Sequence, residues 1–401
     1  MKEIIIILSL SLTYCIRLDP SVLDTSKNPA ALLASFLLAS VTGAGAGKGT
    51  GTQAASCIST GNNTTPWGWL AVNPDANLIY VTNYVGTGPH RVTFINATTG
   101  AYMNGTLANS SFTTQSGPTG VAVNPATNLL YVSHGQLNTN KLTLFNATTG
   151  AYAFGTIAAS TFSTGSRPDL IRLNPTSNLL YAGNNPTSSV TYFNAATGNY
   201  MNGTLGASSF TTQSSPGAVA VNPNANLFYA ANSSMNSVTF LNAATGAYAF
   251  GTLGASSFAA GTTPNGLAVD PAANLLYVVN YTAKTVTFMN ATTGAYAFGT
   301  LAASSFATGS LPSQVAVNPA ANLLYVSNSG TSAVPNEPKV TFFNATTGAY
   351  AFGTFEASSF VKDSVLVGEV AVNPTANLIY IVDISRSCVL FLNATTGAYV
   401  F

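Results

Sequence analysis

The sequence predicts an all-β fold, a seven-bladed β-propeller with four antiparallel strands in each blade. The motif Val-Asn-Pro-x-x-Asn-Leu-Leu-Tyr, or a close variant, recurs seven times, at intervals of 51, 50, 48, 48, 48 and 55 residues. Each copy also contains four short apolar runs separated by turn residues. Four strands in each repeat of this length are typical of a propeller blade. A β-solenoid with open ends is the alternative architecture.

Residues 312–360 illustrate how one copy predicts its strands. Asn318 and Pro319 form a turn between the first two strands, because proline fixes φ and the Asn side chain caps the turn. Gly348 ends the Asn-Ala-Thr-Thr-Gly segment at a position that requires a positive φ, which predicts a tight hairpin. The expected strands are, in order, 314–317, 322–327, 340–343 and 349–355. Residues 357–360 then lead to the next copy.

The two ends of the repeat array indicate how the ring closes. The last copy stops at Phe401 and lacks the segment that follows in the fifth copy, Gly299–Gly309. Gly51–Gly61 matches that missing segment at seven of eleven positions. We therefore expect residues 51–61 to join the last blade by continuing its fourth strand. A ring requires such a closure, whereas a solenoid does not.

Two of the three cysteines fall at this closure. We expect Cys57 just past the end of the fourth strand of blade seven and Cys388 at the start of its third strand. These positions lie at the same end of an antiparallel pair, so we predict a Cys57–Cys388 disulfide. Two free buried thiols are the alternative.

The N-terminal segment has the pattern of an export signal. Residues 1–14 combine a charged start with an apolar run, and Cys15 follows in a context that resembles a bacterial lipobox. This predicts a lipidated Cys15, a flexible tether over 15–50 and a propeller over 51–401. In a second interpretation, residues 44–46 (Ala-Gly-Ala) are a signal-peptidase site and the protein is secreted free. Either interpretation predicts an exported protein, and the first places it on a bacterial-type cell envelope.

The repeats resemble a known family. The order Ala-Val-Asn-Pro, Leu-Tyr-Val-x-Asn, Val-Thr-Phe-x-Asn and Thr-Gly is similar to the YVTN family of propeller repeats, over residues 66–401. The strand pattern is also similar to that of seven-bladed lactonase-like propellers. The resemblance implies the architecture and says little about function.

The first strand of each blade lies nearest the ring axis, so the residues that begin these strands are candidates for a binding site. The candidates at the channel mouth are Trp69, Asp169, Arg172, Asn265, Gln314 and Glu369. Four of them supply oxygen donors that could hold Ca²⁺, although a solvated channel mouth is the simpler interpretation. Arg172 could pair with Asp169 or remain solvated. His90 and His134 fall in loops between the second and third strands, where we expect surface residues rather than a metal site.

Charge is sparse, with a formal net charge of +1, which gives no attraction to nucleic acid. Eight of the 16 charged residues after position 65, Glu337 among them, lie between 337 and 386. Blades six and seven are therefore the first place where we expect a partner.

These observations favour a non-enzymatic binding or scaffolding module at the envelope, for a protein or carbohydrate ligand. Its membrane attachment is through the N-terminal lipid alone, and no resident cofactor is expected. The alternative is a lactonase-like hydrolase that uses the channel mouth.

Overall fold

A computed structural model describes residues 52–61, 68–84, 89–135, 139–185, 187–330, 339–361 and 366–401. The chain divides into two compact units, Met1–Gly47 and Lys48–Phe401, and every described residue belongs to the second. The predicted signal peptide, Cys15, the tether and Glu337 therefore lie outside the described residues. In the part of the chain that the structure describes, no helix is long and apolar enough to cross a membrane.

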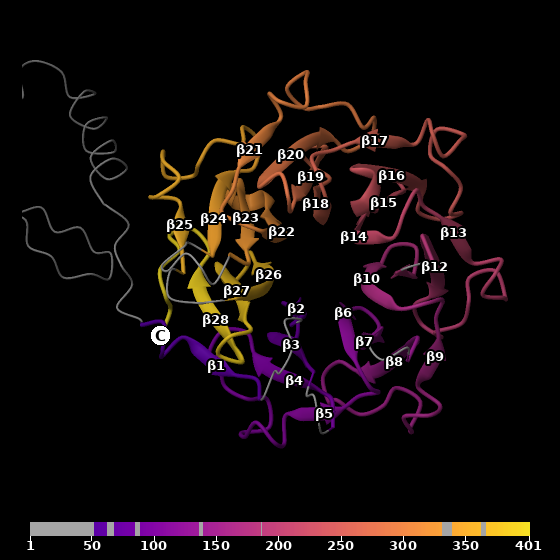
Figure 1. Cartoon of the computed structure of the whole chain (residues 1–401). Helices are drawn as coiled ribbons and strands as arrows, with labels where there is room; N and C mark the ends of the chain where they lie inside the picture. Colours follow the sequence, from indigo (N-terminus) through magenta and orange to yellow (C-terminus); the bar gives the residue numbers. More distant parts are fainter. Residues whose placement is uncertain are drawn as a thin grey trace, which may run out of the picture. The chain divides into compact units, whose positions relative to one another are not determined.

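The second unit is the predicted seven-bladed propeller, because seven four-stranded antiparallel sheets surround one axis (Figure 1). The innermost strands are β2(Leu70–Asn73), β6(Pro118–Asn124), β10(Pro168–Asn174), β14(Pro216–Asn222), β18(Pro264–Asp270), β22(Pro312–Asn318) and β26(Val367–Asn373). The second strands are β3(Leu78–Asn83), β7(Leu129–His134), β11(Leu179–Asn184), β15(Leu227–Asn232), β19(Leu275–Asn280), β23(Leu323–Asn328) and β27(Leu378–Asp383).

The outer half of each blade completes the sheet. The third strands are β4(Arg91–Asn96), β8(Lys141–Asn146), β12(Ser189–Asn194), β16(Ser237–Asn242), β20(Thr285–Asn290), β24(Val340–Asn344) and β28(Cys388–Asn393). The outermost strands are β5(Ser111–Thr113), β9(Thr161–Ser163), β13(Ser209–Thr211), β17(Ser257–Ala259), β21(Ser305–Ala307), β25(Ser359–Phe360) and β1(Cys57–Ser59). Two short 3-10 helices, η3(Ser233–Met235) and η4(Pro319–Ala321), lie in turns of blades four and six.

The predicted turn between the first two strands is confirmed. In blade six, Pro319 begins η4 and the Asn318 side chain accepts a hydrogen bond from the amide of Ala321. Asn322 then adopts a left-handed conformation with φ of 52°. Asparagine tolerates this conformation better than most residues, which explains why it occupies that position in every copy.

The expected position of the fourth strand is wrong. Residues 349–355 form only one bridge, between Tyr350 and Phe343, and the outermost strand is β25 instead. The chain cannot stay extended after Tyr350, because Gly353 has a φ of 85° and the Ser358 hydroxyl accepts a hydrogen bond from the amide of Phe352. Consequently β1 alone forms the outermost strand of blade seven. It does not continue a strand that begins before Phe401.

A hydrogen-bonded ladder of side chains crosses six of the blades. In blade one the Asn83 amide donates to the Thr93 hydroxyl at 2.7 Å, and that hydroxyl lies 2.8 Å from the hydroxyl of Ser111. Equivalent triads occur in the next five blades. Each triad ties the second, third and fourth strands together, and it satisfies hydroxyl groups that burial would otherwise penalise.

Seven tyrosines connect each blade to the next. In blade one the Tyr80 hydroxyl donates to the carbonyl of Ala147 in blade two. The last member, Tyr380 of blade seven, donates to the carbonyl of Ala97 in blade one at 2.8 Å. The other five are Tyr131, Tyr181, Tyr229, Tyr277 and Tyr325. The interaction across the junction of the termini therefore matches those inside the ring.

The closure itself is made by both ends of the chain. Strand β1 pairs with β28, and the amide of Phe401 donates to the Ser56 hydroxyl at 3.0 Å. The predicted disulfide between Cys57 and Cys388 is present, with a Cα–Cα distance of 5.4 Å. Cys57 is the first residue of β1 rather than a residue beyond the strand, and it lies diagonally from Cys388, which is opposite Ser59.

Candidate functional site

The channel mouth contains a cavity of about 70 Å³, where the innermost strands of several blades begin. This volume is well below the roughly 300–1,000 Å³ of pockets that enclose whole drug-sized ligands. The cavity can therefore receive only a small group or the end of a larger ligand. Its lining residues are Trp69, Thr119, Arg167, Asp169, Leu170, Asn185, Pro216, Gly217, Asn265 and Gln314.

A β-bulge positions the cavity-lining residues of most blades. The pairing of β10 with β11 shifts register between Pro168 and Leu170, so Asp169 has no partner in the ladder. The same shift leaves Asn265 unpaired in β18. A bulge redirects the side chain of its extra residue. Because the bulged residue differs from blade to blade, it is the position at which the repeat can vary without loss of the sheet.

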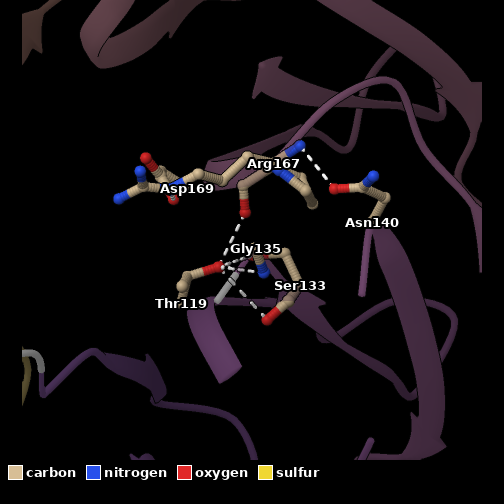
Figure 2. A network of polar contacts seen from close by, with 7 residues as sticks. Thr119, Ser133, Gly135, Asn140, Arg167 and Asp169 are labelled. Atoms are coloured by element: carbon tan, nitrogen blue, oxygen red, sulfur yellow. Dashed lines mark hydrogen bonds and ion pairs between the residues drawn. The ribbon is translucent and has the colours of Figure 1, made fainter. Parts of the chain in front are cut away.

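Asp169 forms an ion pair with Arg167, and a local hydrogen-bond network positions them (Figure 2). The Arg167 Nε lies 3.2 Å from the Asp169 carboxylate, and the Arg167 amide donates to the Asn140 side chain at 2.7 Å. The Thr119 hydroxyl donates to the carbonyl of Pro168 at 2.7 Å and accepts from the amide of Gly135 at 3.0 Å. Burial raises the pKa of Asp169, and the positive charge of Arg167 opposes that shift.

A second ion pair crosses the channel. Arg172 of β10 lies 3.7 Å from Glu369 of β26, and these strands belong to blades three and seven, on opposite sides of the axis in Figure 1. Six of the blades have alanine at the position of Arg172. Burial raises the pKa of Glu369 to about 7, although Arg172 favours the ionised form. Arg172 therefore does not pair with Asp169, one of the two alternatives considered for it, because each arginine holds a different carboxylate.

Three polar side chains that line the cavity have unused hydrogen-bonding capacity. Trp69 and Gln314 are only 9% and 7% exposed. Among the described residues, neither the indole N–H of Trp69 nor the side-chain amides of Gln314 and Asn265 have a hydrogen-bond partner. Buried polar groups are normally paired, so the buried indole N–H of Trp69 indicates a place for a ligand or for ordered water. The amide of the half-buried Asn265 and that of Gln314 line the same cavity.

His134 is not the surface residue that we expected, whereas His90 is only half-buried. His134 is the last residue of β7 and is fully buried, with its Nε2 2.9 Å from the Thr143 hydroxyl. Burial lowers its pKa to about 3, and the nearby charge of His90 acts in the same direction. His90 precedes β4 and stacks near Tyr84, with ring centroids 4.9 Å apart. His134 takes the place of asparagine in the triad of blade two, so its role is structural.

Of the eight charged residues in blades six and seven, three are buried, Glu356 and Arg386 are exposed, and Glu337, Lys362 and Asp363 lie outside the described residues. Lys339, Glu369 and Asp383 are buried, and Asp383 forms an ion pair with Arg386 at 3.0 Å. Burial removes these three charges from any surface that a partner could contact. The residues at the channel mouth, which come from blades one to six, are the better candidate.

The residues that could hold Ca²⁺ do not fit that ion well. Asp169 and Asn265 line one cavity with Gln314, whereas Glu369 is not among its lining residues. Both carboxylates already have an arginine partner, and a calcium site needs free anionic oxygens. No group of three or more His, Cys, Asp or Glu residues meets at a possible metal site within the described ranges.

Fold and site together define a seven-bladed β-propeller whose variable residues gather at one end of the channel. The sequence matches no protein-family model and no curated protein. The resemblance to YVTN repeats therefore depends on the repeat motifs alone.

Solved structures share the architecture. Hydrazine synthase of Kuenenia stuttgartiensis is 15% identical, with a TM-score of 0.63, over 84% of this chain and 97% of that chain. A functionally unknown protein from Desulfotomaculum acetoxidans is also 15% identical, with a TM-score of 0.55, over 84% and 95%. U3-55K is 11% identical, with a TM-score of 0.62, over 85% and 99%. At identities this low, the similarity shows a common fold, and the functions of these proteins cannot be assigned to this chain.

Proposed function

We propose that this chain is an exported, envelope-associated binding propeller without catalytic activity, anchored by a lipid on Cys15. The observation that carries the proposal is the set of bulged residues at the channel mouth. The turns and apolar positions repeat in every blade, whereas the bulge positions hold Thr119, Asp169, Gly217, Asn265 and Ser313 in blades two to six. Variation from blade to blade at one position of a rigid ring is typical of a recognition surface.

The charges at this face also suit binding. Asp169 is neutralised by Arg167, and Glu369 by Arg172. Each arginine opposes the rise that burial gives to the pKa of its carboxylate, so each carboxylate is a weaker proton acceptor than it would be without its arginine. Export agrees with the Cys57–Cys388 disulfide, since such bonds persist mainly in oxidising compartments.

A lactonase-like hydrolase is the second candidate, and one observation favours it. The pKa of Glu369 is raised to about 7, which is the range that suits a general base at neutral pH. The test is hydrolysis of a simple γ-lactone by the full-length protein and by its Glu369→Gln variant. Turnover that disappears in the variant would establish the hydrolase and overturn the binding proposal, whereas equal background rates would support binding.

The envelope attachment is tested by the intact mass of the protein purified from its membrane fraction. We expect a mass that corresponds to cleavage before Cys15 plus acyl chains. An unmodified chain that begins after residue 46 would show free secretion instead. A mass that still includes residues 1–14 would contradict export through this signal.

A further inference from the structure

The chemistry of the channel-mouth cavity indicates a class of ligand. The side-chain amides of Gln314 and Asn265 can each donate and accept hydrogen bonds, and the Trp69 indole can only donate. None of these groups has a partner among the described residues. A ligand that satisfies all three must therefore offer acceptors and donors close together.

Charge narrows the class further. The carboxylate that lines the cavity, Asp169, is paired with Arg167, so the two charges of the lining cancel. An anionic ligand would meet the Asp169 carboxylate, and a cationic ligand would meet the Arg167 guanidinium. An uncharged ligand avoids like-charge repulsion from either group. It also needs no counter-charge when it enters a partly buried site.

Size gives the last constraint. A cavity of about 70 Å³ accepts only the end of a ligand. A sugar at the end of a glycan presents neighbouring hydroxyl groups, each of which donates and accepts. The ends of a peptide, in contrast, carry charge.

We propose that the channel-mouth cavity binds the terminal, uncharged sugar of a glycan through hydrogen bonds to Gln314, Asn265 and Trp69. This inference rests on the proposed binding function and names its ligand class. The sugar hydroxyls donate to the amide oxygens of Gln314 and Asn265, and they accept from the amide N–H groups and from the Trp69 indole.

The probe is the fluorescence of Trp69. The chain has two tryptophans, so Trp67→Phe leaves Trp69 as the reporter in the full-length protein. This variant is titrated separately with maltose, cellobiose, lactose and N,N′-diacetylchitobiose. We expect a saturable change in emission with at least one of these neutral sugars. Glucuronic acid and glucosamine, which carry charge, should bind at least ten-fold more weakly.

The repeat supplies variants that the fold already accommodates. Gln314→Ala introduces the residue that blade four has at this position, Ala218, and Asn265→Gly introduces the residue of the same blade, Gly217. Each should weaken sugar binding about ten-fold, the loss expected for one or two hydrogen bonds. Asn104→Phe is the matched control, because it changes an exposed residue at the outer rim to the residue found there in blade two, Phe154. It should leave the affinity unchanged.

Three results would overturn the inference. The first is no saturable change in Trp69 emission with any neutral sugar, and the second is tighter binding of a charged sugar. The third is that Gln314→Ala and Asn265→Gly bind the sugar with the same affinity as the parent. Each leaves the proposed binding function standing, with a different ligand or surface. Lactone turnover that depends on Glu369 would instead remove the binding function itself, so the two failures are distinguishable. Thermal unfolding of every variant confirms that a loss of binding is not a loss of fold.

Discussion

The disulfide at the junction of the chain ends should supply a large share of the stability of the ring. Cys57 and Cys388 are 331 residues apart in the sequence. In the chain-entropy model, a loop of that length destabilises the unfolded state by about 6 kcal/mol. The described ring spans about 350 residues, and an unfolding entropy of about 2.1 cal/mol/K per residue converts this free energy into about 8 °C of melting temperature.

The perturbation is Cys57→Ser with Cys388→Ser in a Cys15→Ser background. Serine is suited to both sites, because outermost strands have it at the position of Cys57, as in Ser111, and third strands at the position of Cys388, as in Ser189. Blade seven has Leu390 where the other blades have the threonine of the triad. Adding Leu390→Thr therefore gives the hydroxyl introduced by Cys57→Ser a hydrogen-bond partner and separates the lost cross-link from an unsatisfied hydroxyl.

Calorimetry with and without a reducing agent is the assay. We expect the oxidised parent to melt about 8 °C above both serine variants, and the reducing agent to lower the melting temperature of the parent alone. A difference below about 2 °C would refute the entropic reasoning, because the pairing of β1 with β28 would then hold the ring closed unaided. Two free thiols in the unfolded, unreduced parent would refute the disulfide itself.

Three further predictions concern the ring and its channel. The raised pKa of Glu369 means that the native state binds more protons than the unfolded state between about pH 4.5 and 7. The free energy of unfolding should therefore fall by about 3 kcal/mol as pH rises through that window, and chemical denaturation of Glu369→Gln should show a smaller fall. Gly150→Ala should destabilise the protein by about 2 kcal/mol more than Gly155→Ala in the same assay, because both have positive φ but only the first Cβ would overlap a phenylalanine ring of blade one. Equal losses would contradict that packing. Tyr380→Phe and Tyr229→Phe should each cost about 1 kcal/mol, and a much smaller loss at Tyr380 would mean that the junction between the last and first blades is looser than the others.

The local pattern of the repeat was sufficient to predict the number of blades, the turns and three strands of each blade. These features depend on neighbouring residues, since Asn-Pro turns and short apolar runs select their conformations locally. The fourth strand was misplaced for the same reason. Residues 349–355 have the alternating composition of a strand, but the sheet edge pairs instead with Ser359, which lies near the Thr341 hydroxyl.

The candidate site was predictable in part. Trp69, Asp169, Asn265 and Gln314 were found because they begin strands that must surround the axis, and all four line one cavity. Arg167 was missed, although its position two residues before Asp169 was a usable signal. The triads were also missed, and the threonine that recurs in the third strands of blades one to six could have revealed them.

By itself, the sequence determined that seven similar units form a closed ring and that Cys57 and Cys388 meet where it closes. Repetition and the matched ends contain that information, because each blade packs only against its neighbours. The tertiary structure alone decided which charges pair and which side chains stay unpaired. Arg172 reaches Glu369, 197 positions away, because the ring places blades three and seven on opposite sides of one narrow channel. No local pattern specifies such a contact, since its geometry arises only when the first strand, β1, joins the last blade and closes the ring.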